Sequence, residues 1–198
     1  VAYPCSVHHR VAFALKHCVS VAALEAFAVR YMSSMSAPRG GTTMARILSL
    51  DDDPVLIEIM RRVLQAVGFE FLGTTDEQEA LSILRTQPVD LFTQDFMRPG
   101  LGGYEFLRYM KSDSTLSSIP VLAITATSEE ACAEGLRRVG LDIDRDLAGF
   151  VCKPFSPSEL VDVIETILRK HGKPVPPGVE AFRKRARMPR EAQTGSAE

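Results

Sequence analysis

Apolar residues between residue 45 and about residue 171 follow two alternating spacings. Short, mostly apolar runs are typical of buried strands, whereas apolar residues that recur every three or four positions are typical of helices with one buried face. Five strands are predicted, at residues 47–50, 70–73, 90–94, 121–125 and 150–152. Helices are predicted after each strand, at residues 54–67, from 75, at 103–111, at 127–139 and from 157. This alternation predicts an α/β domain, a doubly wound parallel sheet between two helical layers.

Side chains that cap helix N-termini support three of these helices. The last helix begins with Ser156 as the cap, Pro157 at the first helical position and Glu159 to complete a capping box. Gly172 and Pro174 end it. The same signature predicts the starts of two earlier helices, at Thr75 with Gln78 and at Thr127 with Glu130.

The segments on either side of this region differ from it. Residues 1–43 carry four Lys or Arg residues against a single acid, Glu25. A targeting peptide shares this basic character, but charges interrupt the apolar part, so we interpret residues 1–43 as a leader, non-native or partly helical, outside the core function. Residues 172–198 combine four prolines with a basic cluster. They are predicted to form a flexible basic tail, with a docking segment for an acidic partner as the alternative.

The composition is that of a soluble globular protein. The 198 residues suffice for one ordinary domain with tails, and 45% of them are hydrophobic. The net charge of −2 does not indicate a nucleic-acid partner. No apolar stretch is free enough of charges to span a membrane. The four cysteines lack zinc-site spacing and a disulfide pattern, which favours reduced thiols and a cytoplasmic location.

Polar side chains follow four of the five predicted strands. The first strand ends in Asp51-Asp52-Asp53, the third in Asp95, the fourth in Thr125, and the fifth is followed by Lys153. Ligands of doubly wound sheets bind at the carboxyl ends of the strands. Carboxylates there would suit Mg²⁺, and a hydroxyl and an ammonium group would suit phosphate oxygens. Each residue alone could be a helix cap, a turn residue or a solvated side chain, but together they indicate phosphoryl transfer to an aspartate.

These motifs resemble the receiver domain of two-component response regulators. The resemblance rests on residues 47–54, 90–103, 121–126 and 153–155, which occur in the family's order and with nearly its usual spacing. It covers residues 44–171 and implies a (βα)5 flavodoxin-like three-layer sandwich with strand order 2-1-3-4-5.

The resemblance assigns the site residues by position. It implies that Asp95 is the phosphoacceptor and that Asp51, Asp52, Asp95 and the backbone carbonyl of Met97 bind Mg²⁺.

The resemblance also implies roles for four further positions, of which Thr125 and Phe150 form the switch. Thr125 contacts the phosphoryl oxygens, Lys153 pairs with the phosphoryl group or with unmodified Asp95, and Phe150 is coupled to the movement of the threonine. The Lys153–Pro154 bond is expected to be cis.

The function that the resemblance implies is that of a stand-alone response regulator, a signalling domain rather than an enzyme. It would receive the phosphoryl group from a histidine kinase or a phosphotransfer protein and switch protein–protein interactions. We expect no DNA-binding domain, because the chain after Gly172 is short and rich in proline. We expect a monomer or a weak dimer.

Three features depart from the family pattern. Thr93 and Gln94 are polar in a strand that should be covered on both faces, so they need hydrogen-bond partners. Met97 is bulky and apolar, which predicts shielding of the acyl phosphate and slow autodephosphorylation. Residues 141–147 form an insertion before the fifth strand, next to the family's usual dimerisation surface.

Two alternatives differ in class. In a haloacid-dehalogenase-type phosphatase, Asp51 would be the nucleophile and Asp53 the acid/base, but the motif order is wrong and no acidic pair follows Lys153. A receiver-like binding module that works without phosphate would keep the fold, yet such modules normally lose one of the site residues, and this chain has them all.

Overall fold

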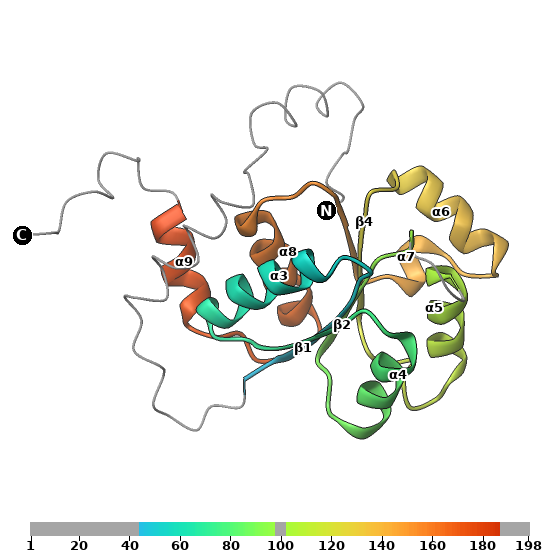
Figure 1. Cartoon of the computed structure of the whole chain (residues 1–198), viewed down its shortest axis with the longest axis horizontal. Coiled ribbons are helices and arrows are strands. Elements are labelled where there is room, and N and C mark those ends of the chain that lie inside the picture. The colour runs from blue at the N-terminus through green and yellow to red at the C-terminus, as the bar shows by residue number, and fades with distance from the viewer. Residues whose placement is uncertain (1–43, 98–101, 187–198) are drawn as a thin grey trace, which may run out of the picture.

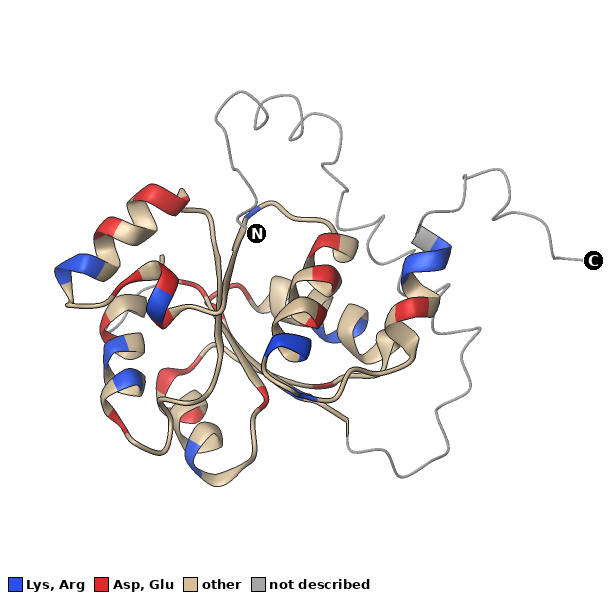
Figure 2. Cartoon of the chain, turned by 180° about the vertical axis from the view of Figure 1, so that it is seen from behind, with Lys and Arg blue, Asp and Glu red and all other residues tan. Residues whose placement is uncertain are grey.

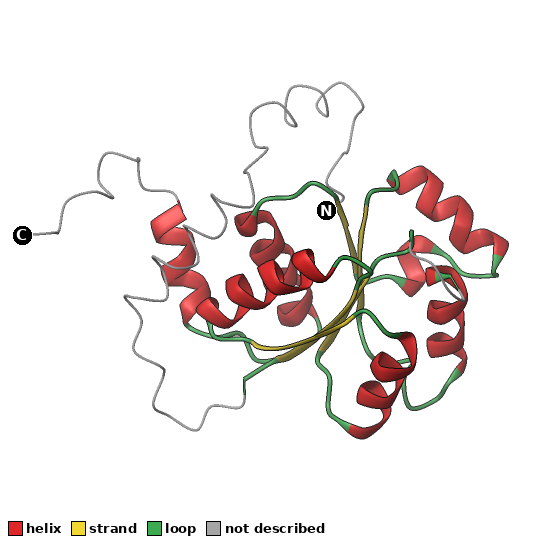
Figure 3. Cartoon of the chain, in the orientation of Figure 1, coloured by secondary structure: helices red, strands yellow, loops and turns green. Residues whose placement is uncertain are grey.

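Five parallel strands form one sheet in the computed structural model, which describes residues 44–97 and 102–186. The strands are β1 (Arg46–Leu50), β2 (Glu70–Thr74), β3 (Leu91–Gln94), β4 (Val121–Thr125) and β5 (Gly149–Cys152). Their order is β2-β1-β3-β4-β5, and every pairing is parallel. The predicted doubly wound sheet and its strand order are therefore confirmed. Figure 3 shows the strands between the helices.

Two helical layers cover the sheet (Figure 1). One contains α3 (Pro54–Val67), α8 (Pro157–Lys170) and α9 (Gly178–Ala186). The other contains α4 (Glu77–Thr86), α5 (Gly103–Ser112), α6 (Glu129–Arg138) and the short α7 (Ile143–Asp146). Among the described residues, no helix is both long and apolar enough to cross a membrane.

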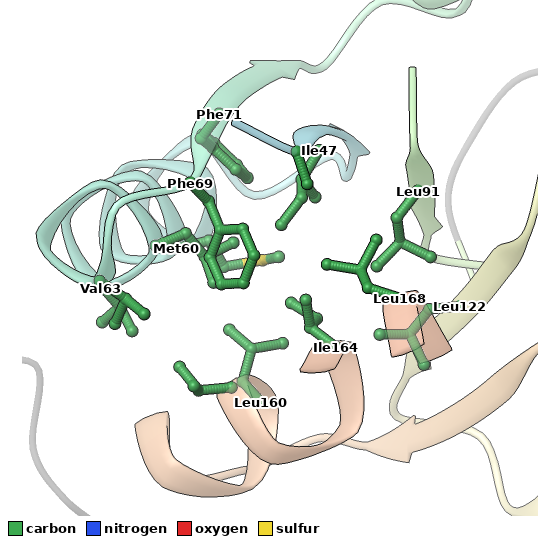
Figure 4. Close-up of a cluster of buried hydrophobic side chains, with 14 of the residues drawn as sticks. Ile47, Met60, Val63, Phe69, Phe71, Leu91, Leu122, Leu160, Ile164 and Leu168 are labelled. Carbon is green, nitrogen blue, oxygen red and sulfur yellow. The ribbon is translucent and has the colours of Figure 1, made fainter. Parts of the chain in front are cut away.

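A separate apolar core lies on each side of the sheet. Figure 4 shows the core under α3 and α8, where Met60 and Ile164 meet strand residues such as Ile47 and Leu122. All four side chains are at most 1% exposed, and burying a side chain of this size contributes about 1.5–3 kcal/mol. The second core contains Leu50, Phe92 and Leu107. Packing on both faces holds the carboxyl ends of the strands in fixed register.

Helix caps agree with the sequence at one predicted start and differ at two. Ser156 and Glu159 form the predicted capping box of α8. The prediction at Thr75 was wrong, because Asp76 caps α4 through the Glu79 N–H at 2.7 Å. The prediction at Thr127 was also wrong: Ser128 caps α6. In each case the residue after the predicted threonine caps at least as well, so the helix begins one residue later.

The prediction of a flexible tail was wrong for the residues that form α9. This helix lies beside α3 and α8, with Lys and Arg on its second half (Figures 1 and 2). Val179 and Phe182 are 2% and 1% exposed, and the Arg183 guanidinium pairs with Asp162 at 2.5 Å and with Glu165 at 2.6 Å. The two buried apolar side chains of α9 are too few to give a helical period in the sequence. So short a helix is stabilised mainly by its packing against the rest of the domain. Residues 1–43 and 187–198, the predicted leader and the end of the tail, lie outside the described residues.

The predicted insertion at residues 141–147 is folded. Asp142 caps α7 by accepting hydrogen bonds from the N–H groups of Asp144 and Arg145. Leu141 and Leu147 flank the helix and are each 9% exposed in the second core. The insertion therefore adds a polar turn of helix that is anchored by two leucines.

Candidate functional site

Three carboxylates come together at the carboxyl edge of β1 and β3. These strands are neighbours, with Leu50 opposite Gln94, so the residues that follow them, Asp51 and Asp95, lie side by side. Asp51 is 2% and Asp95 5% exposed, whereas Asp52 faces solvent. One oxygen atom from each of the three lies within 4.8 Å of the others. The sequence prediction that strand ends bring these acids together is borne out by this arrangement.

Lys153 lies between the two buried carboxylates. Its Nζ donates hydrogen bonds to Asp51 Oδ2 at 2.6 Å and to Asp95 Oδ2 at 2.7 Å. The backbone N–H of Lys153 donates to the Thr125 carbonyl at 2.9 Å, which extends the pairing of β4 and β5. The Lys153–Pro154 bond is cis, as predicted.

Burial and hydrogen bonding act in opposite directions on the ionisation of this group. Burial raises the pKa of Asp51 and outweighs its hydrogen bond from Lys153. Burial would also raise the pKa of Asp95, but hydrogen bonds from Lys153, the Met97 N–H and Thr125 together lower it. The pKa of Lys153 is raised, because its two carboxylate partners outweigh burial. Asp95 is therefore an ionised carboxylate at neutral pH, available as a nucleophile.

Thr125 and Phe150 occupy neighbouring strands beside this cluster. Thr125 is fully buried at the end of β4, hydrogen-bonds to Asp95 and accepts from the Thr127 N–H at 3.4 Å. Phe150 lies in β5 opposite Ala123 and packs, half-buried, against the second core. The Thr125 hydroxyl is thus within reach of a group bound to Asp95. The Phe150 ring lies on the adjacent strand, two residues before Cys152, the residue opposite Thr125.

Met97 and Asp53 have different surroundings from the buried acids. The Met97 N–H donates to Asp95 Oδ1 at 2.9 Å, and its side chain is 62% exposed. Asp53 caps α3, accepting from the N–H groups of Val55 at 2.9 Å and Leu56 at 3.3 Å. Its carboxylate is therefore engaged at the helix terminus rather than in the acidic cluster.

The donor set fits a small, hard divalent cation. Two buried carboxylates and one exposed carboxylate offer oxygen atoms within 4.8 Å of one another, and Asp51 carries a desolvated charge that a cation would stabilise. Mg²⁺ uses few carboxylates and retains several waters, which suits a site that is open on the Asp52 side.

Comparison with known proteins agrees with this geometry. A model of the response regulator receiver domain matches residues 47–165. The chain belongs to the response regulator receiver domain family. A phosphate regulon transcriptional regulatory protein, PhoB of Pseudomonas aeruginosa, is 33% identical over 126 residues, which cover 64% of this chain and 52% of that protein. The DNA-binding response regulator MtrA of Mycolicibacterium smegmatis is 33% identical over 130 residues, 66% of this chain and 53% of that protein.

Solved receiver structures share the fold. The chemotaxis response regulator CheY4 of Vibrio cholerae superimposes with a TM-score of 0.56 at 26% identity, covering 64% of this receiver-family chain and all of CheY4. The chain spans about half the length of the curated relatives that it matches. Receiver domains are signalling domains that bind Mg²⁺ at an acidic pocket and interact with histidine kinases or phosphotransfer proteins.

One feature beside the site had no signal in the sequence. An apolar groove of about 230 Å³ runs between α3 and the start of α8, next to Lys153. Its walls include Leu56 and Ile59 of α3 and Phe155 and Leu160 from the segment after β5. These residues are about 100 positions apart along the chain, so no local pattern predicts that they meet.

Proposed function

We propose that this receiver domain accepts a phosphoryl group on Asp95 from a histidine kinase or a phosphotransfer protein, and that the modification changes its contacts with other proteins. The observation that carries the proposal is the Asp95 carboxylate, which is 5% exposed, has a lowered pKa and is hydrogen-bonded to Lys153. A buried carboxylate that stays ionised can act as a nucleophile, and the neighbouring ammonium group can compensate charge on the transferred group.

The proposed reaction is a direct displacement at phosphorus. An Asp95 oxygen forms a new O–P bond as the P–N bond to the donor imidazole breaks, and the imidazole leaves with the bonding electrons. Mg²⁺ bound by Asp51, Asp52, Asp95 and the Met97 carbonyl would neutralise charge on the transferred group. Lys153 donates hydrogen bonds to the phosphoryl oxygens, and the Thr125 hydroxyl supplies another donor.

The switch follows from the change in charge at Asp95. The phosphoryl group brings additional negative charge and oxygen acceptors, so it favours the arrangement in which Thr125 and Lys153 close on it. Moving a population from 1:99 to 99:1 needs roughly 5.5 kcal/mol of differential interaction, which several charge-assisted hydrogen bonds can supply. Phe150 would transmit the change to the surface formed by α6, β5 and α8. We predict that the protein is a stand-alone regulator, a monomer or a weak dimer, and that it signals directly through contacts with other proteins.

The alternatives receive less support. The phosphatase hypothesis needs Asp53 as an acid/base, whereas the Asp53 carboxylate caps α3. A module that works without phosphate has no need for a partly buried lysine between two buried carboxylates, an arrangement that costs desolvation energy.

Incubation with acetyl phosphate and Mg²⁺ tests the proposal. We expect an added mass of about 80 Da, one phosphoryl group, that disappears with a chelator. Asp95→Asn should abolish the addition, whereas the matched control Asp144→Asn, an exposed acid of α7, should retain it. Equal phosphorylation of Asp95→Asn and the wild type would refute the assignment of the acceptor.

A further inference from the structure

A buried glutamine precedes the proposed phosphoacceptor. Gln94 is the last residue of β3 and is 1% exposed. Because side chains alternate along a strand, Gln94 lies on the same face as Phe92 and Phe96, in the core under α4, α5 and α6, while Asp95 lies on the opposite face. An amide in this position is surrounded by apolar side chains.

The Gln94 amide ties β3 to the beginning of α5. Its Nε2 donates to the carbonyl of Gly103, the first residue of α5, at 2.6 Å. This hydrogen bond closes the connection that contains Asp95 and Met97, the residue whose N–H donates to Asp95 Oδ1. The amide therefore links the residue directly before Asp95 to the first residue of α5, which follows Asp95 in the chain.

Gly103 makes the contact between α5 and the acceptor close. A Cβ atom at Gly103 would lie 2.5 Å from the Phe96 Cα and 2.9 Å from the Asp95 carbonyl oxygen. Only glycine allows this approach, and the Gln94 hydrogen bond holds the carbonyl of the same residue. The first turn of α5 is thus pressed against the main chain of Asp95 and Phe96.

The arrangement lowers stability locally. The Gln94 Oε1 is buried and has no partner among the described residues. An unsatisfied buried amide oxygen is unfavourable, and an apolar side chain of similar volume would avoid this cost. Features that oppose stability in this way are expected where function requires them.

We propose that Gln94 is a positioning residue for the phosphoryl acceptor site: its amide holds the first turn of α5 against Asp95 and so fixes the main chain of residues 95–97 for Mg²⁺ binding. The inference rests on the proposed function. Gln94 touches neither the metal nor the phosphoryl group. It acts through Gly103 and through the backbone that carries Asp95 and the Met97 carbonyl.

Gln94→Met tests this role, because methionine keeps the length and volume of the side chain without the donor. Two quantities are measured: the Mg²⁺ concentration needed to raise the melting temperature, and the Mg²⁺ dependence of phosphorylation by acetyl phosphate. We expect the melting temperature without Mg²⁺ to stay equal or rise, the apparent Mg²⁺ affinity to fall roughly tenfold, and the phosphorylation rate at saturating Mg²⁺ to change much less.

Thr93→Val is the matched control. Thr93 lies in the same strand on the opposite face, is 1% exposed, and its Oγ1 also has no partner among the described residues. It makes no bond to α5 that would be lost, so its Mg²⁺ affinity should equal that of the wild type.

The outcomes separate the two proposals. Equal Mg²⁺ affinities in Gln94→Met and the wild type, with normal phosphorylation of both, would overturn the role of Gln94 and leave the proposed function intact. A Mg²⁺ effect of Gln94→Met without phosphorylation of any variant would support the role of Gln94 and refute the phosphoacceptor. If Gln94→Met and Gln94→Leu both failed to fold, the amide would be holding the fold rather than the site, and the inference would be wrong.

Discussion

Lys153 Nζ lies 2.7 Å from Asp95 Oδ2, although the two residues are 58 positions apart in the chain. Asp51 Oδ2 accepts a second hydrogen bond from the same ammonium at 2.6 Å. One cation therefore compensates two carboxylates that are 3% and 6% exposed at the side chain. Both the stability of this edge of the sheet and the proposed phosphorylation of Asp95 should therefore depend on Lys153.

Replacing the lysine should destabilise the domain. In Lys153→Met, two buried carboxylates lose the ammonium group that pairs with both of them, and we expect the free energy of unfolding at neutral pH to fall by about 3 kcal/mol in the absence of Mg²⁺. Urea unfolding measures the loss. Lys170→Met, an exposed lysine of α8, is the control. A loss no larger than that of the control would contradict a stabilising role for the pair.

The contribution of the pair should depend on pH in a defined direction. The lowered pKa of Asp95 contributes stability above its unfolded value, near 4, that is lost as the pH falls through the folded value. The raised pKa of Lys153 contributes stability below about 10.4 that is lost as the pH rises further. The raised pKa of Asp51 has the opposite effect to that of Asp95: it contributes stability at low pH that is lost as the pH rises through the folded value. The difference between wild type and Lys153→Met should therefore be largest between these limits and shrink as the pH falls below about 4.

Mg²⁺ should stabilise the domain through the acidic cluster. A ligand at ten times its dissociation constant adds about 1.4 kcal/mol to the free energy of unfolding, so calorimetry should show a higher melting temperature with Mg²⁺. Asp52→Asn should remove most of this increase and leave the metal-free stability nearly unchanged, because Asp52 is exposed.

Asp53→Asn is a closely matched control for the metal. Asparagine caps helices about as well as aspartate, so α3 should be unaffected. The Asp53 carboxylate is outside the acidic cluster, so its Mg²⁺ response should match the wild type. A response lost equally in both variants would indicate that the Mg²⁺ effect arises from general charge rather than from the site.

The site residues could be predicted from the sequence because each of them lies at the end of a strand. Asp51, Asp95 and Lys153 each directly follow a predicted strand, and parallel strands bring such positions to one edge. The structure added what depends on distant partners. Nothing local indicates that Phe182 packs against α3 and α8, or that the Gln94 amide reaches Gly103.

The C-terminal helix should contribute to global stability. Phe182 is 1% exposed in the core under α3 and α8, and Phe182→Ala should lower the free energy of unfolding by about 3 kcal/mol. Chemical denaturation measures this, with Lys184→Ala, an exposed residue of α9, as the control. Phosphorylation of Asp95 should persist in both variants. No change in Phe182→Ala would mean that α9 detaches from the domain in solution.

Met97 should influence how long the phosphoryl group survives. Its N–H donates to Asp95 Oδ1, so the residue is held beside the acceptor, while its thioether side chain is 62% exposed and offers no strong hydrogen bond to an incoming water. In Met97→Asn, an amide at this position could hold and orient a water for attack on phosphorus. We expect autodephosphorylation to accelerate roughly tenfold, which corresponds to about 1.4 kcal/mol in the barrier.

The decay of the phosphorylated mass after removal of acetyl phosphate measures the rate of autodephosphorylation. The control is Met97→Leu, which keeps an apolar side chain and should lose its phosphoryl group at the wild-type rate. A wild-type lifetime that is already short and is unchanged in Met97→Asn would show that water reaches the acyl phosphate regardless of this side chain.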